Sequence, residues 1–256
     1  MQRLSELADL LGAPLVGADA AFTRVTTDSR EVEVGDLFVA LRGERFDGHA
    51  YVAGAAGKGA VGAVVERKLD APIAQLLVPD ALQALQRAAQ AWRLRFGIPV
   101  VAVTGSNGKT TTKQLLAALF AARGPVLATK GNLNNHIGLP LTLLGLRPEH
   151  CTAVIEMGAN HPGEIARLTE ITRPDVGVIT QAGDAHLEGF GSREGVARAK
   201  GELFAGLSPD GVAAINADDE YAPLWRDLAQ GQQIDFGITA PAAVRAEDLS
   251  TLEDGG

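Results

Sequence analysis

Seven consecutive residues have the composition of a phosphate-binding loop: Thr104-Gly105-Ser106-Asn107-Gly108-Lys109-Thr110. The apolar run at 100–103 precedes them and a helical pattern at 111–122 follows, which is the strand, loop and helix order that such loops require. Glycine lets backbone N–H groups turn inward, the helix N-terminus adds partial positive charge, the lysine neutralises phosphate oxygens, and the threonine hydroxyl can ligate Mg²⁺. The usual first glycine of the motif is Val103 here, and the alternative is a glycine-rich turn with a solvated lysine.

Two further polar side chains follow later strand-like runs. Glu156 comes directly after 152–155 and can hold Mg²⁺, which prefers oxygen ligands; it can equally be a strand-end acid that faces water. His186 follows the run at 176–179, and a lone histidine in a loop is usually solvated. Because parallel strands end at one edge of their sheet, where ligands bind, we expect both side chains at that edge.

Periodicity alone gives two other residues ordinary roles. Lys200 lies in a helical pattern at 194–204 whose apolar face excludes it, so spacing predicts a surface lysine. Asn135 lies in the polar run 129–138 after a strand-like run, where turn formation is the default interpretation.

Two pairs of polar residues also follow β-prone runs. Asn216 and Asp219 come after 212–215 and either contact a nucleoside or cap the next helix, and their spacing favours the cap. Ser29 and Arg30 can grip a phosphate, although a turn with a surface arginine is the more economical interpretation.

The order of these runs predicts an α/β fold with two domains. Apolar strands that alternate with helices in the later part of the chain indicate a mostly parallel sheet with helices on both faces, as in phosphate-loop domains. Before it, a helical stripe at 4–11 and four short β-prone runs predict a small α/β domain. A long helix is expected from the N-cap candidate Asp80 to Phe96. The predicted domains are therefore 1–80 and 81–256, the second incomplete at its C-terminal end.

Composition narrows the class of protein. Apolar residues make up 46% and charged residues 21%, which is typical of a globular protein and not of disorder. The net charge of −8 argues against nucleic acid as a partner, although a few backbone N–H groups suffice for one nucleotide. We find no signal peptide and no apolar run of roughly 20 residues, so we expect a cytoplasmic protein without membrane insertion. A monomer is a separate expectation. Cys151 is the single cysteine, and we expect it to be buried and inert.

The order of the motifs resembles the Mur ligase family, and the resemblance extends over essentially the whole chain. It is carried by Asp28-Ser29-Arg30, Gly35 to Ala40, Phe46 to His49, Thr104 to Thr110 and Asn216 to Asp219. Within the family, three more runs resemble the branch that joins D-alanyl-D-alanine to a UDP-linked muramoyl tripeptide: 131–135, 156–161 and 186–191. The resemblance therefore implies an ATP-dependent, amide-forming ligase of peptidoglycan synthesis.

The resemblance also implies roles for individual residues. The first domain is expected to bind the uridine diphosphate of the substrate through Ser29 and Arg30, with Asn135 as a further substrate contact. Contacts to ATP are expected from Gly105, Asn107, Gly108, Lys109, Thr110, Asn216 and Asp219. Two Mg²⁺ ions are expected on Thr110, Glu156, His186 and a carbamylated Lys200. The residues expected to take part in catalysis are Lys109, His186 and Lys200.

The implied reaction begins with attack of the tripeptide carboxylate on the γ-phosphate of ATP. This gives an acyl phosphate, which the amine of D-alanyl-D-alanine then attacks. Family members carry a third, C-terminal domain that closes on ATP, and we expect this chain to be a fragment without it. Two alternatives stay open. One is another Mur-type or folylpolyglutamate-type ligase, the latter disfavoured by residues 1–80; the other is a non-catalytic nucleotide-binding switch.

Overall fold

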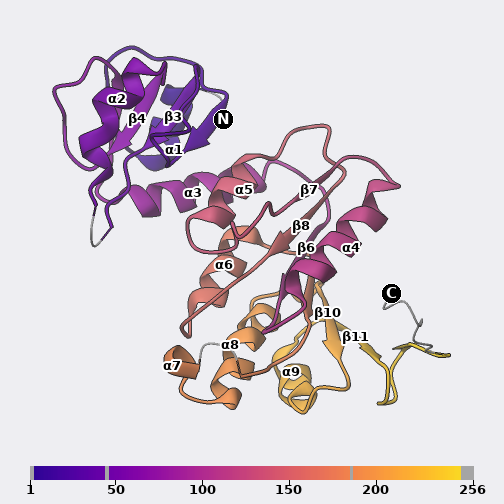
Figure 1. The fold of residues 1–256 in the computed structure, drawn as a ribbon. Helices are drawn as coiled ribbons and strands as arrows, with labels where there is room; N and C mark the ends of the chain where they lie inside the picture. The colour runs from indigo at the N-terminus through magenta and orange to yellow at the C-terminus, as the bar shows by residue number, and fades with distance from the viewer. Residues whose placement is uncertain (1–2, 44–45, 185–186, 249–256) are drawn as a thin grey trace, which may run out of the picture. The chain divides into compact units, whose positions relative to one another are not determined.

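The computed structural model describes residues 3–43, 46–184 and 187–248. Its internal contacts divide the chain into two compact units (Figure 1). Unit 1 consists of Met1–Gly97 and His136–Pro148, and unit 2 consists of Ile98–Asn135 and Glu149–Gly256. Each unit is therefore assembled from two separate stretches of sequence.

Unit 1 is built on a five-stranded sheet with the order β1-β5-β4-β3-β2. Its strands are β1 (Leu15–Val16), β2 (Arg24–Thr26), β3 (Asp36–Val39), β4 (Gly62–Val65) and β5 (Ala74–Leu77). Its helices are α1 (Leu4–Leu11), the 3-10 turn η1 (Gly48–Tyr51), α2 (Val52–Gly57), α3 (Ala81–Arg93) and α5 (Gly138–Leu144). Strands β2 to β5 are parallel and β1 is antiparallel to β5. The central strands β3 and β4 are buried throughout, so the core surrounds them.

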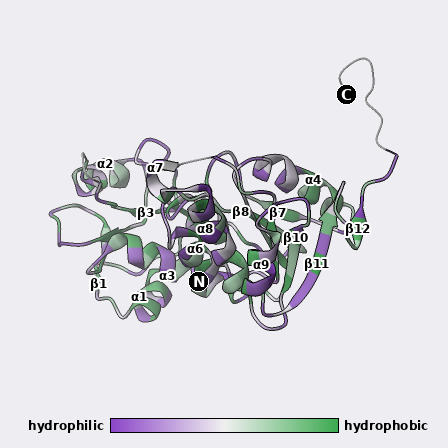
Figure 2. Ribbon diagram, turned by 90° about the horizontal axis from the view of Figure 1, so that it is seen from below, coloured by the Kyte–Doolittle hydropathy of each residue, from purple (hydrophilic) through white to green (hydrophobic). Residues whose placement is uncertain are grey.

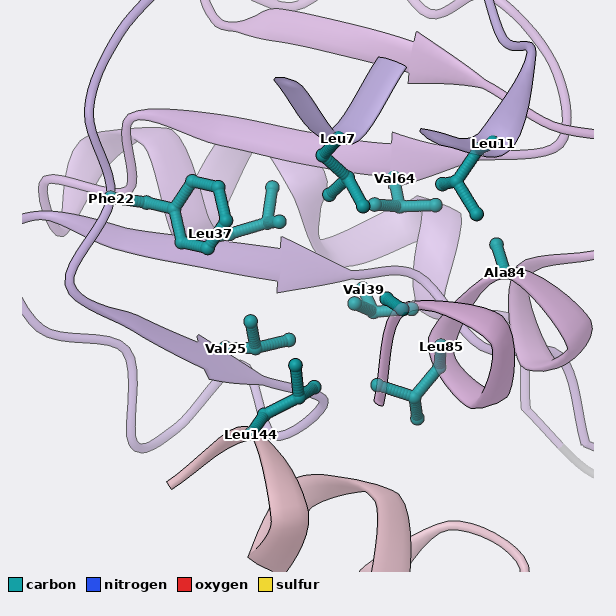
Figure 3. A pocket seen from close by; sticks show the side chains of 11 residues that line it. Leu7, Leu11, Phe22, Val25, Leu37, Val39, Val64, Ala84, Leu85 and Leu144 are labelled. Atoms are coloured by element: carbon teal, nitrogen blue, oxygen red, sulfur yellow. The ribbon is translucent and has the colours of Figure 1, made fainter. Parts of the chain in front are cut away.

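Alternate side chains of β3 face opposite sides of this sheet, as strand geometry requires. Phe38 belongs to one cluster with Val52 and Ala55 of α2. Leu37 and Val39 line a small apolar cavity on the other side (Figure 3). Three helices, α1, α3 and α5, supply further lining residues: Leu7, Leu11, Ala84, Leu85, Ala88 and Leu144. Unit 1 thus has helices on both faces of its sheet.

Helix α3 begins as the sequence predicts, because the side chain of Asp80 accepts a hydrogen bond from the N–H of Gln83 at 2.8 Å. Its packing partners were not predicted. The indole of Trp92 donates to the carbonyl of Leu146 at 3.1 Å, and the Gln86 side chain donates to the carbonyl of His136 at 3.0 Å. The contacts therefore place α3 and α5 in unit 1, whereas the boundary predicted from sequence separates residue 81 onward. Helical periodicity identifies an apolar face but not the core that this face joins.

Unit 2 is built on a parallel sheet with the order β12-β11-β10-β9-β6-β8-β7. Its strands are β6 (Val100–Thr104), β7 (Val126–Ala128), β8 (Thr152–Glu156), β9 (Val176–Ile179), β10 (Val212–Asn216), β11 (Gln232–Gly237) and β12 (Val244–Arg245). Its helices are α4 (Lys109–Ala121), α6 (Glu164–Thr172), α7 (Leu187–Phe190), α8 (Arg193–Ala205) and α9 (Ala222–Leu228). The predicted parallel sheet is confirmed.

Helices lie on both faces of this sheet. The backbone of Gly177 in β9 lies against Leu203 and Phe204 of α8. The neighbouring Val178 joins a cluster on the opposite face with Phe120 of α4. Strands β6 and β8 are buried at every position between the two layers, which explains why both read as continuous apolar runs.

Two features of unit 2 differ from the sequence expectations. Strand β11 was not predicted, because it begins with the exposed, hydrophilic Gln232 and Gln233 and offers no apolar run (Figure 2). The expectation of a buried Cys151 is wrong: this residue is exposed, with its thiol 3.7 Å from the carbonyl oxygen of Glu149. In the part of the chain that the structure describes, no helix combines the length and apolar character needed to cross a bilayer.

Candidate functional site

The loop between β6 and α4 has a shape that two glycines make possible. Gly105 has a φ of 144° and Gly108, the N-cap of α4, has a φ of 78°. A side chain at position 105 would place its Cβ 1.9 Å from the hydroxyl oxygen of Thr180. That hydroxyl donates to the carbonyl of Asn107 at 2.6 Å, which ties the loop to the end of β9. Position 105 therefore requires glycine for two reasons: its φ is one that other residues rarely adopt, and a side chain there would collide with Thr180.

Lys109 closes over this loop. Its ammonium donates to the carbonyl oxygens of Gly105 at 2.7 Å and Ser106 at 3.2 Å. Burial lowers the pKa of Lys109, and the negative charge of Glu156 partly opposes this shift. The loop thus carries a cation at the first turn of a helix, where the helix N-terminus also favours an anion.

Glu156 is the centre of a buried polar cluster at the end of β8. Only 2% of the residue is exposed. One carboxylate oxygen, Oε2, accepts a hydrogen bond from the Thr110 hydroxyl at 3.0 Å and lies 3.3 Å from the ammonium of Lys113. The other, Oε1, accepts from the Asn134 amide at 2.8 Å. Its backbone N–H donates to the Thr129 hydroxyl at 2.9 Å. A buried carboxylate needs such partners, and here they also fix its direction.

Predicted site residues therefore meet at one edge of the unit 2 sheet, where Lys109, Thr110 and Glu156 lie together. Asn135 is exposed, and its neighbour Asn134 is the residue that contacts Glu156. His186 lies outside the described residues. Among the described residues, no group of three or more histidine, cysteine, aspartate or glutamate side chains is arranged to hold a metal ion.

Asn216 and Asp219 connect the loops that follow β9 and β10. The Asn216 amide donates to the carbonyl of Thr180 at 2.8 Å. The Asp219 carboxylate accepts from the N–H of Ala182 at 2.8 Å and from the N–H of Tyr221 at 2.9 Å. The bond from Tyr221 lies just before α9, as a helix cap would. The bonds to Ala182 and Thr180 reach the loop that follows β9. Both side chains thus stand beside the phosphate-loop edge of the sheet.

The expectation from periodicity that Lys200 is an ordinary surface lysine is wrong. Its exposed fraction is 2%, and its ammonium lies 5.4 Å from the centre of the Phe190 ring. Burial, and to a smaller extent the positive charge of Lys109, lower the pKa of Lys200 to about 8, although the negative charges of Glu164 and Glu202 oppose the shift. Within the described chain, no hydrogen bond or ion pair holds this ammonium.

Ser29 and Arg30 lie in unit 1 and form a turn. The N–H of Arg30 donates to the Asp28 carboxylate at 2.9 Å, and its exposed guanidinium pairs with the same carboxylate. The guanidinium and backbone hydrogen bonds from Arg30 lower the pKa of Asp28 to about 2. The ammonium of Lys58 donates to the carbonyls of Ser29 at 2.9 Å and Arg30 at 3.0 Å. This geometry matches the turn interpretation and leaves the guanidinium at the surface.

Sequence reasoning gave no site role to Lys113 and Thr180, and it named Asn134 only within the polar run 129–138 and the family-like run 131–135. Only Lys113 carried a usable signal, because it lies four residues after Lys109 in a helix and so shares a face with it. Asn134 and Thr180 reach the site through loops whose course the sequence does not specify.

These features define an α/β protein with a phosphate-binding loop. A parallel strand leads into a loop with two glycines at positive φ, and a helix then begins at Lys109. An acid stands at the end of the adjacent strand in the sheet. The family profile described as "Mur ligase middle domain" matches residues 103–256, and the one described as "Mur ligase family, catalytic domain" matches residues 21–94. The chain belongs to the Mur ligase family.

Curated relatives give the same assignment. The chain is 47% identical over 231 residues to UDP-N-acetylmuramoyl-tripeptide--D-alanyl-D-alanine ligase of Escherichia coli, covering 90% of this chain and 51% of the relative. It is 42% identical to the protein of the same name in Bacillus subtilis, with 90% and 50% coverage. This chain thus spans about half the length of the curated relatives that it matches.

Solved structures agree with the fold. The crystal structure of MurF from Acinetobacter baumannii aligns with a TM-score of 0.90 at 40% identity, covering 97% of this chain and 55% of that one. MurF ligase from Thermotoga maritima, solved in complex with ADP, aligns with a TM-score of 0.77 at 36% identity, covering 85% and 51%.

Proposed function

We propose that this chain provides the uridine-nucleotide-binding and ATP-binding parts of a ligase that joins D-alanyl-D-alanine to UDP-N-acetylmuramoyl-tripeptide. The observation that carries the proposal is the 47% identity over 90% of the chain to a ligase with this name. The proximity of Lys109, Thr110 and Glu156 at one edge of the sheet supports it, because phosphoryl transfer needs a cation and metal ligands beside the phosphates.

ATP would bind at the loop between β6 and α4. Its phosphates would accept hydrogen bonds from the backbone N–H groups of residues 105–110, and Lys109 would exchange its two carbonyl partners for phosphate oxygens. Asn216 and Asp219 would lie near the nucleoside. The Thermotoga maritima relative was solved in complex with ADP, which supports the proposal that this chain binds an adenine nucleotide.

The chain offers suitable ligands for Mg²⁺, which prefers oxygen donors and substrate phosphates. The Thr110 hydroxyl and the Glu156 carboxylate already approach within 3.0 Å of each other. A metal between them would replace this hydrogen bond, and His186 would complete the set together with Lys200. Two bound ions would neutralise charge on the transferring phosphoryl group.

Lys200 would contribute as a carbamate. Its buried amine has a pKa lowered to about 8, so an appreciable neutral fraction is present near neutral pH. The neutral nitrogen can attack CO₂, which forms an N–C bond, releases a proton and leaves an oxygen-donating anion. This modification would also remove the mismatch of an ammonium buried without a partnering carboxylate.

The reaction would proceed in two steps. A carboxylate oxygen of the tripeptide attacks the γ-phosphorus, ADP leaves, and an acyl phosphate forms; Lys109 would stabilise the transferring charge. The amine of D-alanyl-D-alanine then attacks the acyl carbon, phosphate leaves, and the amine loses its proton. Ser29 and Arg30 would hold the uridine diphosphate in unit 1, and Asn135 would contact the substrate.

Phosphate release by the protein expressed from its complete gene tests this function. We expect release from ATP only when both UDP-N-acetylmuramoyl-tripeptide and D-alanyl-D-alanine are present, and the product should contain one new amide bond. Release that ignores both substrates would refute the ligase and favour a nucleotide-dependent switch. Release with a different amine acceptor would indicate another Mur-type ligase.

A further inference from the structure

The buried face of helix α4 has an unusual composition. Lys113 is the one residue of this helix that is buried, with 4% of it exposed. On the same helix, Leu115 and Leu119 are 61% and 70% exposed. Burying an ammonium costs free energy unless it is paired, whereas burying leucine would stabilise the protein. Leu116 and Phe120 of this helix are partly buried against the sheet, yet its most buried side chain is the costly ammonium of Lys113 while Leu115 and Leu119 stay exposed, which points to a role for Lys113 beyond packing.

The position of Lys113 indicates that role. Its Nζ lies 3.3 Å from Oε2 of Glu156, and the side chains of both residues are almost fully buried. The same oxygen accepts the hydrogen bond from Thr110, the other proposed Mg²⁺ ligand. A metal ion bound by Thr110 and Glu156 would thus arrive at an oxygen that already has a cation beside it.

We propose that Lys113 is a built-in counter-ion for Glu156. It holds the carboxylate in its binding direction without a metal, and it weakens metal binding until a nucleotide is present. The inference rests on the proposed function, because it takes Glu156 as a Mg²⁺ ligand. It assigns Lys113 as a positioning residue for metal and nucleotide and not as a group that reacts.

Electrostatics gives the physical reason. A divalent ion at Oε2 meets the repulsion of the Lys113 ammonium in a buried site, where the protein screens charge less than water does. Lys109 adds a second positive charge near the same carboxylate, since the charge of Glu156 acts on its pKa. The phosphates of ATP or ADP bring several negative charges and reverse this balance. Metal binding then becomes favourable only together with the nucleotide.

Direct binding of Mn²⁺, a paramagnetic substitute for Mg²⁺, tests the inference by electron paramagnetic resonance. Measurements on the protein from its complete gene compare wild type with Lys113→Met and Lys113→Arg, with and without ADP. Without nucleotide, we expect Lys113→Met to bind Mn²⁺ at least about tenfold more tightly than wild type, because one nearby positive charge is gone. Lys113→Arg should stay close to wild type.

Two controls separate this effect from others. Arg123→Met removes an exposed cation just after the far end of α4 and should leave Mn²⁺ affinity unchanged. The double variant Lys113→Met with Glu156→Gln removes both buried charges, so it should fold but lose the tighter Mn²⁺ binding. If Lys113→Met does not fold, Lys113→Gln provides a neutral side chain that can still donate to Glu156.

The outcomes are distinct. The inference would be overturned if a folded neutral variant bound Mn²⁺ without nucleotide no more tightly than wild type does. The proposed function would still stand in that case, provided that the wild type binds Mn²⁺ together with ADP. Failure of the wild type to bind Mn²⁺ and ADP together would refute the proposed function, and this inference with it.

Discussion

Replacing Gly105 with alanine tests the shape of the phosphate-binding loop. The new Cβ would lie 1.9 Å from the Thr180 hydroxyl oxygen, and no real contact is that short. The backbone φ of 144° adds strain, because side chains of L-residues rarely adopt it. Either the loop or Thr180 must move, and the hydroxyl joins the two by donating to the carbonyl of Asn107 at 2.6 Å, with the carbonyl of Thr104 at 3.3 Å as a weaker second acceptor of the same proton.

The magnitude follows from these contributions. Backbone strain of this type costs about 1–3 kcal/mol, and loss of the hydrogen bond from the Thr180 hydroxyl costs about 1 kcal/mol. We therefore expect Gly105→Ala to destabilise unit 2 by about 2–4 kcal/mol in urea unfolding, and to lose ADP binding in calorimetry. Gly131→Ala is the matched control, because Gly131 has a φ of 53° with no atom near its would-be side chain. It should cost only about 1 kcal/mol, from the backbone alone.

A second variant separates the clash from the backbone strain. Adding Thr180→Ala to Gly105→Ala removes the hydroxyl, so the double variant should recover part of the lost stability but not all of it. A Gly105→Ala protein that binds ADP as tightly as wild type and unfolds at the same urea concentration would refute this account of the loop.

Three further predictions concern other parts of the molecule. Glu156→Gln keeps the shape of the side chain but removes its charge, so it should weaken binding of Mn²⁺ with ADP by at least about tenfold in electron paramagnetic resonance, and unchanged binding would exclude Glu156 as a ligand. Lys200 has a pKa near 8 when folded and 10.5 ordinarily, so the folded state binds fewer protons between these values and wild-type stability should rise with pH across that window. In urea unfolding under CO₂-free buffer, Lys200→Met should lack this rise, and parallel curves for the two proteins would contradict a buried ammonium. Leu143→Ala removes a fully buried side chain of α5 and should destabilise unit 1 by about 2–5 kcal/mol. Hydrogen exchange should then accelerate in β3 and β4 while β8 keeps its protection, and the reverse pattern would place α5 in the other unit.

Local features of the sequence were enough to predict much of the fold. The parallel sheet of unit 2 was predicted because β6 and β8 are continuous apolar runs between helical patterns, and such runs are typical of strands buried on both faces. The start of α3 was predicted because an N-cap bond such as that of Asp80 is formed by residues three apart in the chain. The loop at 104–110 was recognised for the same reason: its residues are contiguous.

The tertiary structure alone decided which residues share a core and which charges are buried together. Periodicity placed Lys200 at the surface, yet it is buried beside Phe190, because the short helix α7 that precedes α8 in the chain folds back against it. The pairing of Lys113 with Glu156 joins a helix to a strand far along the sequence, and the packing of α3 against α5 does the same in unit 1. Local sequence patterns indicate which side chains of a helix or strand face the core. They do not record which distant side chain it meets, and that encounter determines pKa, metal affinity and the boundary between the two units.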